Sequence, residues 1–109
     1  MRVIIEKKVH HVIEDFYMHS LMNHVTLTET SVRRKKKRLY DALASLGDYA
    51  FLYPLSRYKK DWIKNNYRDF ICEDFHFAYT IEVLCSGEEV VAIHDACHSF
   101  LFYNPEDKE

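Results

Sequence analysis

Four side chains that could bind a metal ion lie within five residues near the C-terminal end of the chain, in the run His94-Asp95-Ala96-Cys97-His98. A zinc site needs about four such ligands converging on one point. The β-branched residues before the run predict a strand, and on a strand His94 and His98 share one face while Asp95 and Cys97 share the other. We therefore interpret the run as polar residues at a strand end, and we expect neither a metal site nor another cofactor.

Histidine side chains in this region could also transfer protons, because imidazole titrates near neutral pH. The run Phe75–Leu84 alternates large apolar residues with smaller or polar ones, which predicts a strand with one buried face. On this pattern His76 lies on the face away from the helices, which we expect to be uncovered, and His98 lies at the end of the neighbouring strand. The pattern allows a concave site that holds both imidazoles, but for His76 alone we favour a purely solvent-facing strand residue.

Six positively charged residues occupy consecutive positions in the run Arg33–Arg38. Such a run can bind phosphate groups or act as a nuclear localisation signal. Successive helical residues differ by about 100°, so these side chains surround most of the helix, and Lys35 or Lys36 must extend from near its apolar face. We favour a solvated helix surface, then an acidic protein partner, and then nucleic acid, because the net charge of the whole chain is −2.

The elements that must position these residues begin with a short strand at residues 2–5 and two helices. An apolar stripe from Val9 to Phe16 predicts the first helix. The second helix begins at Thr26 or Thr28, either of which could cap it, and it ends before Gly47. A short loop between the two helices predicts an antiparallel hairpin.

Three antiparallel strands complete the expected fold. A β pattern begins at Trp62–Lys64 and becomes clearer at Tyr67–Glu73. The next two strands are joined by a turn that contains Gly87, which is a hairpin signal. The predicted fold is therefore α+β, in the order β-α-α-β-β-β, with the helical hairpin packed on one face of a small antiparallel sheet.

Length and composition describe one globular domain. The chain has 109 residues, of which 48% are hydrophobic and 15% aromatic, and we assign residues 1–104 to the domain and 105–109 to a polar tail. It contains no apolar run of the roughly 20 residues that a membrane span requires. Cys72, Cys85 and Cys97 show no paired spacing, which indicates free thiols in a reducing cytoplasm.

Taken in order, these elements resemble the RelE/ParE superfamily of bacterial toxins from type II toxin–antitoxin modules. The resemblance covers most of the chain in element order, and its specific residues lie in 62–104. They are Trp62 with the run Tyr67-Arg68-Asp69-Phe70, the aromatic strand Phe75–Ile81, and the strand Val90–His98.

The resemblance implies two kinds of activity, since RelE-like members cleave mRNA on the ribosome and ParE-like members poison DNA gyrase. For RNA cleavage it implies a catalytic role for His98 with Tyr103, although Tyr103 lies farther along than the family's adjacent tyrosine. It also places His76 near the position where the family commonly has an arginine. The residues that could contact nucleic acid or a protein partner are Arg33, Arg34, Lys37, Arg38, Arg57, Lys59, Lys60, Lys64 and Arg68.

Two hypotheses follow for the function. The first is a cytoplasmic bacterial toxin, either an mRNA endoribonuclease or a gyrase inhibitor, which a small antitoxin neutralises and which could also form a homodimer. The second is a non-catalytic protein-binding domain on the same fold, which uses the basic helix surface. Many members of the resembled family are strongly basic, whereas this chain has a pI of about 6.4, so any RNA-binding charge must be local.

Overall fold

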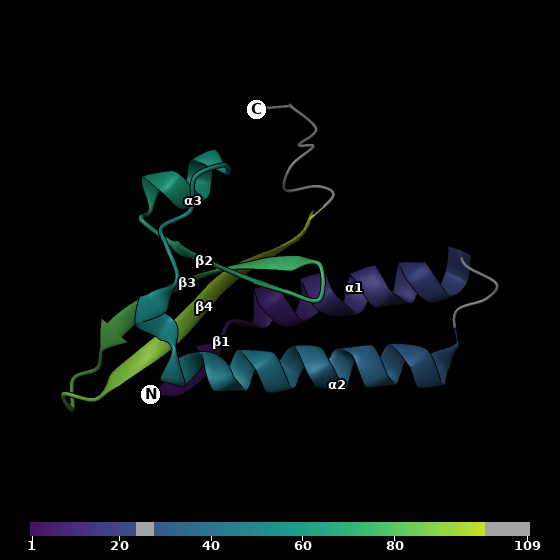
Figure 1. Cartoon of the computed structure of the whole chain (residues 1–109), viewed down its shortest axis with the longest axis horizontal. Helices are drawn as coiled ribbons and strands as arrows, with labels where there is room; N and C mark the ends of the chain where they lie inside the picture. The colour runs from purple at the N-terminus through teal and green to yellow at the C-terminus, as the bar shows by residue number, and fades with distance from the viewer. Residues whose placement is uncertain (24–27, 100–109) are drawn as a thin grey trace.

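The computed structural model describes residues 1–23 and 28–99, and within them the chain follows the predicted α+β order (Figure 1). The elements are β1 (Arg2–Ile5), α1 (Lys7–Asn23), α2 (Glu29–Ser45), the short 3-10 helices η1 (Leu46–Asp48) and η2 (Ala50–Leu52), α3 (Lys60–Lys64), β2 (Arg68–Cys72), β3 (Phe75–Val83) and β4 (Glu89–His98). The polar tail and Tyr103 lie outside the described residues.

The described strands form one sheet in the order β1-β4-β3-β2. Strands β2, β3 and β4 are antiparallel neighbours, as predicted. Strand β1 lies parallel to β4, with Arg2 opposite Val90 and Ile5 opposite Ile93, so the sheet is mixed rather than wholly antiparallel. This parallel pair brings the beginning of α1 next to the second half of β4, and the candidate site depends on that contact.

Helices α1 and α2 run side by side along one face of the sheet (Figure 1). Their apolar residues recur every four positions, which puts Val9 and Ile13 of α1 and Leu39 and Leu43 of α2 on inward faces with no solvent exposure. They pack on the side chains of β3 that alternate toward them, Phe75, Phe77 and Tyr79. The Tyr79 hydroxyl donates a hydrogen bond of 2.6 Å to the carbonyl of Ala50, which satisfies the one polar atom of this buried ring.

The residues at the two ends of α2 are ones that the sequence predicted, a threonine N-cap and a glycine after the helix. Thr28 is the N-cap, and its side chain accepts a hydrogen bond of 3.1 Å from the Ser31 amide; the alternative start at Thr26 lies outside the described residues. Gly47 follows the end of the helix, as predicted. A Cβ atom on Gly47 would approach the carbonyl oxygen of Met1 to 1.9 Å, so close packing of the N-terminus requires glycine here.

The strand predicted to begin at Trp62–Lys64 is wrong, because these residues form the end of α3. Amides of Ile63 and Asn65 donate helical hydrogen bonds to the carbonyls of Lys59 and Asp61, at 3.0 and 3.2 Å. The helix directs Trp62, which has no solvent exposure, against Ala78 on the side of the sheet opposite α1 and α2. Burial of this large ring outweighs the weak β pattern of a Trp-Ile pair.

Candidate functional site

A β-bulge in β4 determines on which face of the sheet His94 and Asp95 lie. Ala78 lies opposite Asp95 and Tyr79 lies opposite Ile93, which leaves His94 as an extra residue in the ladder. An extra residue resets the alternation of side chains along a strand. His94 and Asp95 therefore both lie on the sheet face turned away from α1 and α2, called here the far face, and the predicted grouping of His94 with His98 is wrong.

The two histidines of the predicted catalytic set lie on opposite faces of the sheet. Phe75 pairs with His98, and the His98 ring stacks on Phe16 of α1 with ring centroids 4.3 Å apart. Burial on this helix side lowers the pKa of His98 below its usual value. His76 pairs with Cys97 on the far face, so the structure does not bring the two imidazoles together.

His76 is buried rather than presented to solvent. Its side chain is 1% exposed. The far face, which we expected to be open, is partly covered, since Trp62 of α3 packs on Ala78 there. Its Nδ1 atom lies 2.9 and 3.1 Å from the two carboxylate oxygens of Asp69. A carboxylate only accepts hydrogen bonds, so Nδ1 carries the proton and the ring orientation is fixed.

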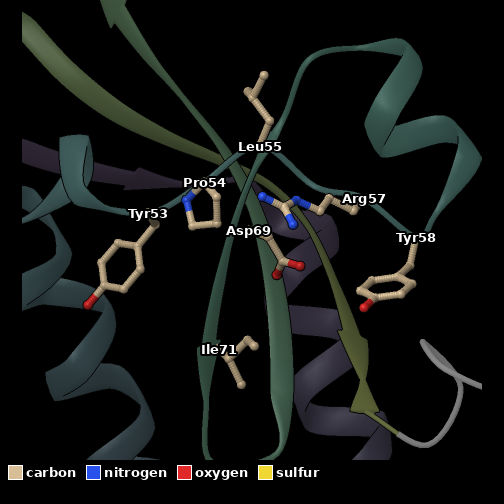
Figure 2. A pocket seen from close by; sticks show the side chains of 7 residues that line it. All are labelled: Tyr53, Pro54, Leu55, Arg57, Tyr58, Asp69 and Ile71. Carbon is tan, nitrogen blue, oxygen red and sulfur yellow. The ribbon is translucent and has the colours of Figure 1, made fainter.

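The Asp69 carboxylate borders an open cleft of about 380 Å³ on the far side of the molecule (Figure 2). Burial raises the pKa of Asp69, and the hydrogen bond from His76 partly opposes this rise. The cleft forms where residues 54–56 cross the start of β2, held by a hydrogen bond of 2.8 Å from the Ser56 amide to the Tyr67 carbonyl. Its lining consists of Tyr53, Pro54, Leu55, Arg57, Tyr58, Asp69 and Ile71.

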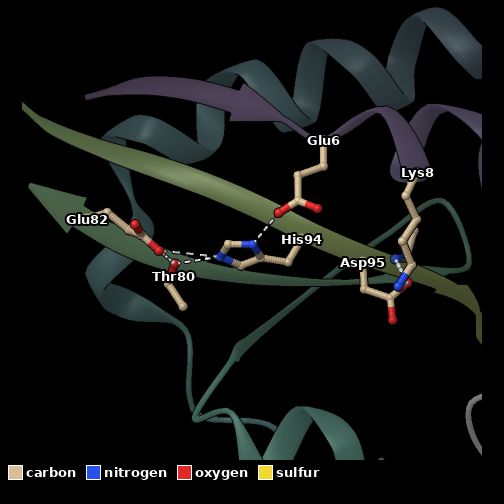
Figure 3. A network of polar contacts seen from close by, with 7 residues as sticks. Glu6, Lys8, Thr80, Glu82, His94 and Asp95 are labelled. Carbon is tan, nitrogen blue, oxygen red and sulfur yellow. Dashed lines mark hydrogen bonds and ion pairs between the residues drawn. The ribbon is translucent and has the colours of Figure 1, made fainter. Parts of the chain in front are cut away.

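A second polar group on the far face centres on His94 (Figure 3). Its Nδ1 atom lies 2.6 Å from Oε2 of Glu6, and its Nε2 atom lies 2.8 Å from Oγ1 of Thr80. The ring also stacks on Tyr67, with centroids 4.9 Å apart. Beside it, Asp95 accepts a hydrogen bond of 2.9 Å from Trp62 and lies 3.6 Å from the ammonium of Lys8.

This carboxylate–imidazole–hydroxyl arrangement does not activate Thr80 as a nucleophile. The Thr80 hydroxyl donates its proton to Glu82 over 2.7 Å, so the proton is not directed at His94. His94 is instead a partly exposed proton-transfer group whose orientation Glu6 fixes. Sequence reasoning missed this pair because the two residues are 88 positions apart, and only the parallel pairing of β1 with β4 brings them together.

The basic run of α2 is partly neutralised within the chain. Lys36 lies 2.7 Å from Glu14, Lys37 lies 2.8 Å from Asp41, and Arg38 lies 3.3 Å from Glu73. Helical geometry predicted that Lys35 or Lys36 would lie near the apolar face of this helix. Lys36 is the more buried of the two. Of the predicted contact residues on α2, Arg33 and Arg34 are exposed and form no ion pair with the described residues.

The cations on and before α3 have few internal partners. We define the α3 surface as Arg57, Tyr58, Lys59, Lys60 and Lys64. None of its four cations forms an ion pair with the described residues, and only Lys59 has a local partner, the Trp62 ring, with its ammonium 6.0 Å from the centroid. Arg68 differs, since its guanidinium donates a hydrogen bond of 2.6 Å to the Tyr53 carbonyl and so holds the chain in place.

The described residues do not provide a metal site, since no three of their histidine, cysteine and acidic side chains are grouped to hold an ion. Cys72, Cys85 and Cys97 are free thiols, as predicted, and burial raises the pKa of Cys72 and Cys97, which lowers their reactivity. No helix within 1–23 and 28–99 is long and apolar enough to cross a membrane.

The fold and the site together define a small α+β domain with a cationic, aromatic cleft beside a three-stranded antiparallel segment of its sheet. Comparison of the chain with protein-family models, with curated proteins and with solved structures found no match.

Proposed function

We propose that this chain is the toxin of a bacterial type II toxin–antitoxin module and that it binds single-stranded RNA through the α3 surface. The element order agrees with the resemblance to the RelE/ParE superfamily. The observation that carries the proposal is that Arg57 and the exposed Tyr58 line the far-face cleft, and that three further cations without an ion pair to the described residues, Lys59, Lys60 and Lys64, follow them in the chain.

Single-stranded RNA is bound by cations that follow its phosphates and by aromatic rings on which its bases stack. Arg57, Lys60 and Lys64 are exposed and supply the cations. The Tyr58 side chain is 64% exposed and supplies the ring. A local surface of this kind can bind RNA although the net charge of the chain is −2, because salt screens charges more than about 8–10 Å away.

RNA cleavage by the 2′-hydroxyl requires a proton-transfer group on the same side of the protein as the bound phosphate. His94 is the partly exposed imidazole on the far face, and its two ring nitrogens face the acceptors Glu6 and Thr80, whose own proton goes to Glu82. We therefore propose His94 as the proton donor: the 2′-oxygen attacks phosphorus and its proton passes to water, while His94 protonates the 5′-oxygen as that oxygen leaves. His98, by contrast, lies against Phe16 on the helix side. The catalytic roles predicted for His76, His98 and Tyr103 remain predictions.

Induced expression in a bacterial host tests the proposal. We expect growth arrest, and we expect extracts that contain the protein to cleave mRNA during cell-free translation. The variant Arg57→Ala/Lys60→Ala/Lys64→Ala should relieve the arrest, whereas the matched triple variant Arg33→Ala/Arg34→Ala/Lys35→Ala should not. Harmless expression without an antitoxin would overturn the toxin proposal, and arrest without mRNA cleavage would favour the gyrase branch, which a supercoiling assay identifies.

A non-catalytic protein-binding function is the second candidate, and exposed apolar residues beside the cleft favour it. Leu55 and Ile71, which line the cleft, are 52% and 57% exposed, and Phe51 and Leu52, which precede it in the chain, are 61% and 75% exposed. Apolar patches of this kind commonly mark protein interfaces. In the toxin proposal the same residues would contact apolar side chains of the antitoxin arm. In the alternative, a labelled peptide with both apolar and acidic residues should bind while RNA does not.

A further inference from the structure

The α3 surface adjoins exposed apolar side chains at the far-face cleft. Leu55, Tyr58 and Ile71 line this cleft and are 52%, 64% and 57% exposed (Figure 2). Arg57, which forms no ion pair with the described residues, lines the same cleft. A guanidinium, a tyrosine ring and two aliphatic side chains are therefore exposed around one small opening.

Helix α3 continues this mixture of apolar and cationic side chains. Trp62 has no solvent exposure and packs on the sheet. Lys60 and Lys64 lie two positions before and after it, and successive helical residues differ by about 100°, so both lysines lie on the opposite side of the helix. Ile63 is 46% exposed. The outward side of α3 thus presents an aliphatic side chain beside two ammonium groups.

The charge of this region is positive although that of the whole chain is −2. Between Pro54 and Lys64 the sequence has four cations, and Asp61 is the one carboxylate. None of these cations forms an ion pair with the described residues. Asp69, the carboxylate that lines the cleft, already accepts a hydrogen bond from His76. Positive charge is therefore concentrated where aliphatic side chains are exposed.

A ligand that matches this surface needs negative charge together with an apolar layer. RNA supplies phosphates and bases but offers little to three exposed aliphatic side chains, Leu55, Ile63 and Ile71, called here the aliphatic set. The boundary of a bilayer that contains anionic lipids supplies both, because its phosphates lie over acyl chains. Helix α3 lies at one end of the molecule, apart from α1 and α2, so a bilayer can approach it without meeting the helical hairpin (Figure 1).

We propose that the α3 surface and the aliphatic set together bind a membrane surface rich in anionic lipids. The aliphatic set enters the boundary between headgroups and acyl chains, while Arg57, Lys60 and Lys64 contact lipid phosphates. Membrane binding goes beyond the RNA binding proposed above. Because RNA phosphates would contact the same cations, RNA and anionic lipid should compete for the protein.

Co-sedimentation of the full chain with lipid vesicles tests the proposal. We expect binding to vesicles of equal parts phosphatidylglycerol and phosphatidylcholine, and at least about tenfold weaker binding to vesicles of phosphatidylcholine alone. Equal binding to both kinds of vesicle, or binding to neither, would overturn the proposal. This measurement needs no variant.

A triple variant of the aliphatic set tests whether these side chains enter the bilayer. Leu55→Ser/Ile63→Ser/Ile71→Ser should weaken binding to the anionic vesicles by at least about tenfold, because apolar area is no longer buried, and should leave the affinity for RNA unchanged. Met18→Ser/Met22→Ser, at positions of α1 that are 59% and 74% exposed, is the control and should change neither. Unchanged vesicle binding of the folded aliphatic variant would mean attraction by charge alone and would contradict the proposal.

The cation variants used for RNA test the second half of the surface. Removal of Arg57, Lys60 and Lys64 should weaken binding to anionic vesicles by about 100-fold, since each cation near an anionic surface contributes a factor of about five. The matched α2 variant should bind the vesicles as the unmodified protein does. Equal losses in the two variants would contradict the assignment of the membrane contact to the α3 surface.

Vesicles and RNA oligonucleotides together distinguish failure of this inference from failure of the proposed function. RNA binding without vesicle binding would remove the membrane surface and keep the RNA proposal. Vesicle binding that RNA does not compete with, in a protein that does not bind RNA, would do the reverse. Binding of a peptide with apolar and acidic residues, with neither vesicles nor RNA bound, would remove both and identify a protein interface.

Discussion

Cations lie both on the side of the sheet covered by α1 and α2, called here the helix side, and on the far face. The cations of the two sides differ in whether they form ion pairs within the chain. On α2, three consecutive cations, Lys36, Lys37 and Arg38, lie within 3.3 Å of carboxylates of the same chain. On the α3 surface, four cations have no ion pair with described residues, and one of them, Arg57, lines a cleft. Internal pairing therefore neutralises half of the longest basic run, Lys36, Lys37 and Arg38, whereas Arg33 and Arg34 stay exposed without an ion pair to the described residues.

The same contrast holds for the imidazoles. On the helix side, His98 stacks on Phe16 and meets the edge of Phe75, and burial lowers its pKa. On the far face, His76 orients Asp69 at the cleft, and His94 is held by Glu6. Titratable groups on the helix side stabilise packing, whereas those on the far face keep polar groups oriented near open space.

The largest expected effect comes from Trp62, which supports the α3 surface. Its ring is fully buried, so Trp62→Ala should lower the free energy of unfolding by about 3–5 kcal/mol. RNA binding should fall with it, since α3 loses its anchor on Ala78 and Asp95. Urea denaturation followed by circular dichroism measures the loss. Val83→Ala, at a side chain that is 65% exposed, is the control and should change stability by less than about 0.5 kcal/mol.

The next largest effect is a decrease in the salt dependence of RNA binding, which tests which cations contact the RNA phosphates. Removal of Arg57, Lys60 and Lys64 together should reduce the slope of log affinity against log salt by about 2, because each phosphate contact on a single strand contributes about 0.7. The matched removal of Arg33, Arg34 and Lys35 should leave that slope unchanged. If the two triple variants behave alike in anisotropy titrations at several salt concentrations, the comparison between the two regions is wrong.

A smaller change, an increase in the salt dependence of RNA binding, is expected when the α2 cations lose their carboxylate partners. In Glu14→Gln/Asp41→Asn/Glu73→Gln the side chains keep their size, and Lys36, Lys37 and Arg38 become available to phosphate. The salt dependence of RNA binding should become steeper, by at most about 2 for three cations. Thermal unfolding should hardly change, because exposed ion pairs contribute little. An unchanged slope would contradict the expectation that internal pairing withholds these three cations from phosphate.

The smallest effect concerns His98. Because its pKa is lower in the folded state, its contribution to stability is complete above its unfolded pKa, about 6.5, and is lost as pH falls below that value. His98→Phe keeps the stacked ring and should reduce the drop in melting temperature between pH 7.5 and pH 5. His11→Phe, at an exposed position, is the control. Loss of growth arrest in a stable His98→Phe protein would support the catalytic role predicted from the sequence.

Much of the fold could be predicted because its signals are local. The stripe of Val9 and Ile13, the cap at Thr28 and the alternation from Phe75 to Tyr79 each act within one element, so they identify the helices and the central strands. The strand predicted at Trp62–Lys64 was wrong because the helix there is stabilised by packing of the Trp62 ring on Ala78 of β3, which lies farther along the chain. The candidate site could be predicted only in part, since Arg57 and His76 were identified but Asp69 and His94 gained their roles from contacts between strands.

The sequence by itself determined the order of elements, the inward faces of both helices and the free state of the thiols, because these depend on residue type and short-range spacing. Only the tertiary structure decided which charges remain available and which imidazoles share a face. The bulge at His94 changes the direction of the side chains on β4, and the parallel pairing of β1 brings Glu6 to His94 across 88 positions. Ion pairing and burial depend on three-dimensional proximity, which the periodicity of a single segment does not contain.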